Sequence, residues 1–117
     1  MDGPVYQKTI DFSISLIGLY KELVQNKEFI ISKQLLRSGT SIGANVHEAA
    51  SAQSRKDFIS KMSIALKEAR ETKYWLIVLS ESKLINFNLT QLLDSIEEII
   101  KIISKIVIST KHNLSIK

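Results

Sequence analysis

The sequence predicts an all-α protein, an antiparallel up-down-up-down four-helix bundle. Apolar residues recur at alternating steps of three and four, which is the period of helices that pack in a bundle. One Pro and four Gly in 117 residues are too few for a turn-rich β architecture. Short connections between successive long helices make sequence neighbours antiparallel. With 44% apolar residues, we expect residues 1–117 to form a single four-helix-bundle domain with one core.

The first helix is expected to begin at Pro4, because the first helical turn does not need the N–H that proline lacks. It fades at Gln25-Asn26-Lys27, which has the composition of a turn. Its apolar seam consists of Val5, Phe12, Leu16, Leu19 and Leu23, flanked by Ile10, Ile17 and Val24. The five seam residues are the expected contribution of this helix to the core.

The second helix is expected from about Ser32, whose hydroxyl could cap it, to Ala52. Its seam is unusual because most members are small or polar: Leu35, Ser38, Ile42, Asn45, Ala49 and Ala52. Gly39 and Gly43 would let another part of the chain come close. A packed face tolerates such residues only where neighbours satisfy them, so we expect a close and specific partner here.

The third and fourth helices are marked by their caps. Ser54-Arg55-Lys56-Asp57 has the form of a capping box, and Asn88 is a good cap for the last helix. The third seam is Phe58, Met62, Ala65, Ala69, Thr72, Leu76 and Leu79. The fourth comprises Leu92, Ile96, Ile99, Ile103 and Ile106, widened by Leu93, Ile100 and Val107. This last arc is broader than one antiparallel neighbour requires, which predicts a homo-oligomer.

Composition also predicts where the protein works. The absence of Cys excludes disulfides and thiolate metal sites. Residues 1–4 lack the features of a secretory signal, and no stretch approaches the roughly 20 apolar residues of a membrane span. We therefore expect a cytoplasmic protein with no membrane partner.

Motifs for chemistry are incomplete. Residues 47–51 begin like the zinc-protease helix, but Ser51 stands where the second His is needed. Neither His follows a Glu by three positions, as a di-iron bundle would require. The Gly-rich residues 39–43 lack the Lys of a phosphate loop. We predict a non-enzymatic protein with no catalytic residue, no metal and no cofactor.

Five polar residues on the second and third helices form the strongest candidate cluster: Arg37, Ser41, Asn45, Glu48 and Glu71. One interpretation is general acid–base work by Glu48 and Glu71. The other is a structural network in which Arg37 pairs with a carboxylate and Asn45 bridges two helices. We favour the structural interpretation, because no nucleophile, metal ligand or proton shuttle accompanies the carboxylates.

A second candidate is a basic stripe on the outer face of the third helix. Residues 31–86 hold nine Lys or Arg against five Asp or Glu, so the positive charge is concentrated there. The stripe consists of Lys56, Ser60, Ser63, Lys67, Arg70 and Tyr74, opposite the apolar seam. Lys56, Lys67, Arg70 and Tyr74 are candidates for binding RNA or DNA by phosphate contact and base stacking. The alternative is a solvated face in which Lys67 pairs with Glu71, on a protein–protein interaction scaffold that ignores nucleic acid.

Residues 34–49, 54–58 and 64–76 resemble the signature of a bacterial four-helix-bundle family. Its members are encoded by intervening sequences of large-subunit ribosomal RNA genes. The resemblance implies a ring of five protomers. It also points to a relative, the accessory variability protein of diversity-generating retroelements, which binds nucleic acid through a basic surface. The matching positions look like family architecture, not catalytic residues: Arg37, Ser38, Ser41, Asn45, Glu48, Glu71 and Trp75.

Overall fold

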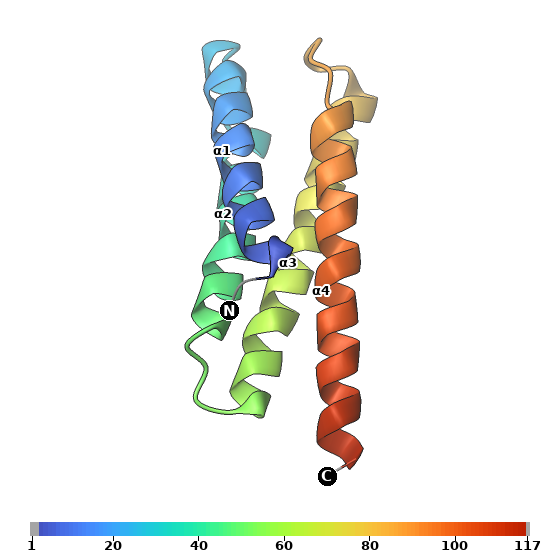
Figure 1. Ribbon diagram of the computed structural model, residues 1–117. Coiled ribbons are helices and arrows are strands. Elements are labelled where there is room, and N and C mark those ends of the chain that lie inside the picture. The colour runs from blue at the N-terminus through green and yellow to red at the C-terminus, as the bar shows by residue number, and fades with distance from the viewer. Residues whose placement is uncertain (1–2, 117) are drawn as a thin grey trace.

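The computed structural model describes residues 3–116 and consists of four long helices joined by short connections (Figure 1). They are α1 (Pro4–Gln25), α2 (Ile31–Ala49), α3 (Arg55–Ser82) and α4 (Thr90–Ile116). No strand occurs among the described residues. The predicted all-α four-helix fold is confirmed. Residues 1, 2 and 117, at the ends of the predicted domain, lie outside the described residues.

The helices form an elongated bundle with extents of 52 × 22 × 21 Å. Each helix packs against its neighbours in the chain, and α1 also packs against α4. The pair α2–α3 has the most extensive contact and the pair α1–α4 the least. Because α1 and α3 lie diagonally across the core, their outward faces point to opposite sides of the molecule.

The predicted apolar seams form the core. All five seam residues of α1 are buried, and Thr9 joins them. On α3 every seam residue is buried except the half-buried Phe58. On α2 the seam was only partly predicted: Val46 is fully buried, whereas Asn45 is half-buried. The buried residues of α4 and the residue before it are Leu89, Ile96, Ile99, Ile103 and Val107.

The start of α2 differs from the prediction. Ser32 lies inside the first turn, and its hydroxyl donates to the carbonyl of Glu28 at 2.8 Å. The carboxylate of Glu28 accepts the backbone N–H groups of Ile30, Ile31 and Ser32 at 3.2, 3.1 and 2.7 Å. A carboxylate satisfies several orphan donors and opposes the positive end of the helix dipole, so Glu28 is the cap. The helix also ends at Ala49, earlier than the expected Ala52.

The caps of the last two helices agree with the sequence. The hydroxyl of Ser54 accepts the N–H of Asp57 at 3.1 Å, and the Asp57 carboxylate accepts the N–H of Gln53 at 3.2 Å. Near the start of α4, the side-chain oxygen of Asn88 accepts the N–H of Thr90 at 3.0 Å. The contacts of Asp57 and Thr90 satisfy donors that the first helical turns leave open, and the contact of Gln53 ties the preceding residue to the start of α3.

The close neighbour expected at the α2 glycines is α1. A Cβ atom on Gly39 would overlap Cδ2 of Leu16 and lie 3.6 Å from Cε2 of Phe12. A Cβ atom on Gly43 would lie 3.2 Å from both Cβ and Oγ1 of Thr9. The two glycines therefore set how closely α1 and α2 approach. No helix in the described part of the chain has both the length and the apolar character to cross a membrane.

Candidate functional site

An ion-pair cluster joins α2 to α3. Nη1 of Arg37 donates to Oε2 of Glu68 at 3.2 Å, and Nη2 donates to Oε2 of Glu71. The same Glu71 oxygen accepts the indole N–H of Trp75 at 3.1 Å. The hydrogen bonds from Trp75 and Arg37 hold the pKa of Glu71 below its ordinary value. We call Arg37, Glu68, Glu71 and Trp75 the Arg37 cluster.

The other predicted network residues lie apart from the Arg37 cluster. The amide of Asn45 donates to the carbonyl and hydroxyl oxygens of Ser41 at 2.9 and 3.2 Å, within α2. The expectation that Asn45 bridges two helices was therefore wrong, because the i, i+4 spacing places its amide over the preceding turn of its own helix. Glu48 pairs with Lys61 of α3, with 3.6 Å between Oε1 and Nζ.

These positions also bear on the acid–base interpretation. Glu48 lies level with Lys61, which is ten residues from Glu71, or about 15 Å along α3. The two carboxylates are therefore too far apart to act as acid and base on one bond. The role of Glu68 was missed in the sequence, although it stands three residues before Glu71 and so one turn away on the same face.

The basic stripe of α3 faces away from the core. Lys56, Lys67 and Arg70 are exposed, and Tyr74 is 58% exposed. None of these three cations forms an ion pair with a described residue. Glu71, the alternative partner expected for Lys67, is hydrogen-bonded in the Arg37 cluster; the charge of Lys67 contributes to its lowered pKa, but the two side chains form no ion pair in the described part of the chain. The positive charges of the stripe therefore remain open to solvent.

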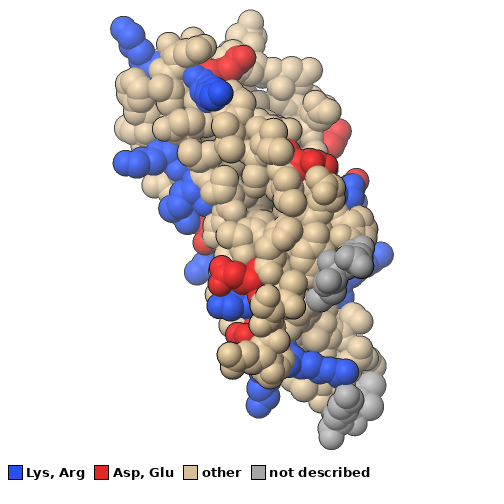
Figure 2. Space-filling view, turned by 60° about the vertical axis from the view of Figure 1, so that its left-hand side comes forward, with Lys and Arg blue, Asp and Glu red and all other residues tan. Residues whose placement is uncertain are grey.

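Ile10 and Ile17, expected to flank the buried seam of α1, instead form an exposed apolar face with Ile14. Ile10, Ile14 and Ile17 are 41%, 63% and 42% exposed on the side opposite the buried seam. Figure 2 brings this side forward and shows a broad area without charged side chains. A shallow groove of about 360 Å³ follows it between α1 and α2, and includes Gly43 and Ala44. The spacing i, i+4, i+7 was the available signal.

The exposed apolar surface of α4 is smaller than its sequence predicts. Leu92, Leu93, Ile100 and Ile106 pack partly against the core, and Ile108 is mostly exposed, at 68%. The apolar arc of α4 is used mainly within the bundle.

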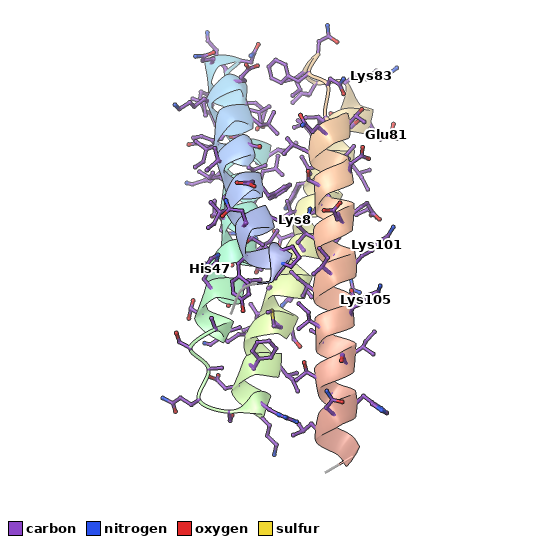
Figure 3. The ribbon with its side chains drawn as sticks, viewed as in Figure 1. Lys8, His47, Glu81, Lys83, Lys101 and Lys105 are labelled. Atoms are coloured by element: carbon purple, nitrogen blue, oxygen red, sulfur yellow. The ribbon has the colours of Figure 1, made fainter. Side chains whose placement is uncertain are left out.

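The seam between α1 and α4 holds a cleft of about 240 Å³. Phe12, Leu92 and Ile99 contribute its apolar lining, and Lys8 of α1 forms an ion pair with Glu98 of α4 beside it. Figure 3 shows Lys8 between the two helices, whereas Lys101 and Lys105 project outward from α4. Within residues 3–116 no group of His, Asp or Glu side chains is arranged to hold a metal ion.

The chain is similar to a known protein family and to a solved structure. The family model described as 23S rRNA-intervening sequence protein matches residues 1–105. The chain is 48% identical to a protein of unknown function from the S23 ribosomal protein family of Bacteroides thetaiotaomicron VPI-5482, whose crystal structure superposes with a TM-score of 0.85. The match covers 88% of this chain and 97% of that one. No curated protein matches the sequence. The chain belongs to the family of 23S rRNA-intervening sequence proteins.

Proposed function

We propose that this protein is a non-enzymatic, homo-oligomeric helical bundle of the cytoplasm that binds RNA or DNA through the basic stripe of α3. The observation that carries the proposal is the exposure of Lys56, Lys67 and Arg70, without ion-pair partners among the described residues, on the face of α3 that points away from the core. Cations in this state can replace the counterions around phosphates, and the released counterions drive binding.

The apolar face of α1 supports self-association. Removing Ile10, Ile14 and Ile17 from water stabilises a complex by about 25 cal/mol for each Å² of apolar surface buried. Because α1 and α3 are diagonal, an oligomer assembled through α1 keeps the basic stripe on its outside. The resemblance to pentameric relatives makes five protomers the expected number.

The nucleic-acid proposal is tested by fluorescence anisotropy with labelled RNA and DNA over a range of salt concentrations. Three phosphate contacts predict a slope of log K against log salt of roughly −2 to −3. The variant Lys67→Glu/Arg70→Glu is expected to remove most binding. Its matched control, Lys101→Glu/Lys105→Glu, changes the net charge equally on an outward part of α4 and is expected to retain it. Absence of binding at low salt, or equal losses in both variants, contradicts the proposal.

Self-association is tested by analytical ultracentrifugation of Ile14→Lys beside Ile108→Lys. Both residues are largely exposed, at 63% and 68%, but they lie on different helices. We expect Ile14→Lys to dissociate the oligomer and Ile108→Lys to leave it intact. A monomeric wild-type protein, or dissociation by Ile108→Lys alone, overturns this part of the proposal.

A second candidate function is a scaffold that engages a protein partner and ignores nucleic acid. The groove between α1 and α2 favours it, because an apolar groove of this kind accommodates an amphipathic helix. An oligomer that persists while the wild-type protein binds no RNA or DNA at low salt would select this alternative.

A further inference from the structure

We infer that the nucleic-acid ligand is single-stranded, that one of its unpaired bases stacks on Tyr74, and that the Arg37 cluster holds this ring in position. The inference rests on the proposed function and names its ligand class more narrowly. It also assigns a positioning role to Arg37, Glu71 and Trp75.

Tyr74 presents a flat surface at the end of the basic stripe. Its side chain is 58% exposed, and its ring packs at an angle against Trp75, with ring centroids 5.1 Å apart and planes inclined by 71°. Such an edge contact covers at most one face of the phenol ring. With 58% of its surface exposed, Tyr74 offers ring surface to a base, and every base has a face that can stack.

The Arg37 cluster restrains the Tyr74 ring through Trp75, against which the ring packs. Trp75 is half-buried, and its N–H donates to Glu71, which in turn accepts a hydrogen bond from Arg37 of α2. Trp75 is thereby held by both α2 and α3, and Tyr74 packs against a fixed neighbour. A ring ordered before binding loses less conformational entropy when a base stacks on it.

Cations stand at suitable positions for the phosphates beside that base. Arg70 lies one helical turn before Tyr74, about 6 Å along the axis, and Lys67 lies about 10 Å away. Both side chains are long and exposed. A strand with one base on Tyr74 can therefore reach both cations with its neighbouring phosphates.

A duplex fits this surface poorly. The major groove of B-form DNA is about 12 Å wide, which admits a lone helix, whereas α3 is flanked by α2 and α4 in a bundle of 22 × 21 Å cross-section. The major groove of A-form RNA is deeper and narrower. Bases in a duplex are also stacked on each other, so none is free for Tyr74.

The test compares short labelled oligouridine and oligothymidine with blunt duplexes of RNA and DNA, using the full chain. We expect the wild-type protein to prefer single strands. Tyr74→Ala should weaken single-strand binding by about 5- to 150-fold, the equivalent of one stacked base, without changing the salt slope. Tyr74→Phe keeps the ring and should bind like wild type. Since stacking needs only the base, the preference for single strands over duplexes is expected with both RNA and DNA.

The positioning role has its own readouts. Trp75→Phe keeps an aromatic neighbour but removes the N–H donor, and it should weaken single-strand binding less than Tyr74→Ala while the salt slope stays unchanged. Trp75 is the single Trp of the chain, so its fluorescence should change when single strands bind wild-type protein and change less in Tyr74→Ala. Circular dichroism checks that each variant keeps its helices.

The outcomes separate the two proposals. Equal affinity for single strands and duplexes, with no effect of Tyr74→Ala, overturns the inference and leaves the proposed function standing. Equal losses in Tyr74→Ala and Tyr74→Phe assign the effect to the hydroxyl group and also overturn stacking. No binding of any nucleic acid removes the proposed function itself.

Discussion

Replacing Gly39 by Ala measures how closely α1 and α2 pack. In any helix interior, exchanging Gly for Ala stabilises the folded state by about 0.5–1 kcal/mol. Gly18, on an open part of α1, has nothing within 4 Å of its would-be Cβ, so Gly18→Ala should show this gain alone. At Gly39 the new methyl group overlaps the side chain of Leu16, which is 1% exposed and would have to shift within the packed core. Overpacking of this kind costs about 1–3 kcal/mol.

The expected net effect of Gly39→Ala is therefore a destabilisation of about 0–2 kcal/mol, and its difference from Gly18→Ala is about 1–3 kcal/mol. Gly43→Ala should fall between the two, because its Cβ would meet Thr9 at 3.2 Å and needs only a small shift. Urea unfolding followed by circular dichroism, at one fixed protein concentration, gives the three free energies. If Gly39→Ala is as stable as Gly18→Ala, the reasoning fails, because α1 and α2 then do not pack as closely as described.

Three further perturbations test caps, buried polar groups and charge. Ser54→Ala removes the acceptor of the Asp57 N–H and should lower the free energy of unfolding by about 0.5–2 kcal/mol; an unchanged urea midpoint would contradict the cap. The hydroxyl of Thr72 donates to the buried hydroxyl of Ser38 at 2.9 Å, so Thr72→Val removes this partner and should lower the free energy of unfolding by about 1–3 kcal/mol. Adding Ser38→Ala should restore part of the loss, and a double variant less stable than the single one would refute this account. The folded pKa of Glu71 is lowered, so its stabilisation is complete above the ordinary pKa of about 4.3 and is lost as pH falls through the folded pKa. The stability gap between wild type and Glu71→Gln should therefore narrow in acid; a gap that stays constant excludes this ionic contribution.

The sequence predicted the core well because helical seams are local patterns. Leu16 and Leu76 belong to runs whose three-four spacing fixes one face of a helix, whatever the helix packs against. The cap of α2 was harder to predict from the sequence, because Ser32 and Glu28 are both reasonable capping residues. The choice between them depends on the path of the turn. Lys27 adopts a positive φ of 61°, and the carboxylate of the next residue lies over the first turn of α2.

The sequence predicted an ion pair at Arg37 but not which carboxylates would form it. Spacing indicated that Arg37 would meet a carboxylate, yet the choice of Glu68 and Glu71 depends on how α2 is rotated and shifted against α3. That register comes from the packing of two helices and is absent from either helix alone. The apolar face at Ile14 was not predicted for another reason. When a helix has apolar residues on two sides, the longer run of apolar residues is assigned to the core, and the second side is assigned to the same seam.

The pairing of α1 with α4 has a consequence for how the bundle assembles. Each of the other contacts joins helices that are consecutive in the chain, so it closes only a short loop, whereas α1 and α4 must be brought together across the length of α2 and α3. Contacts between distant segments carry a larger loop-closure entropy and form more slowly. The three hairpin contacts are therefore expected to form first, with the seam beside Lys8 and Glu98 closing last. We also expect this seam to open at a lower free-energy cost than the others, because α1 and α4 have the least extensive contact and their separation leaves the other three helix pairs in contact.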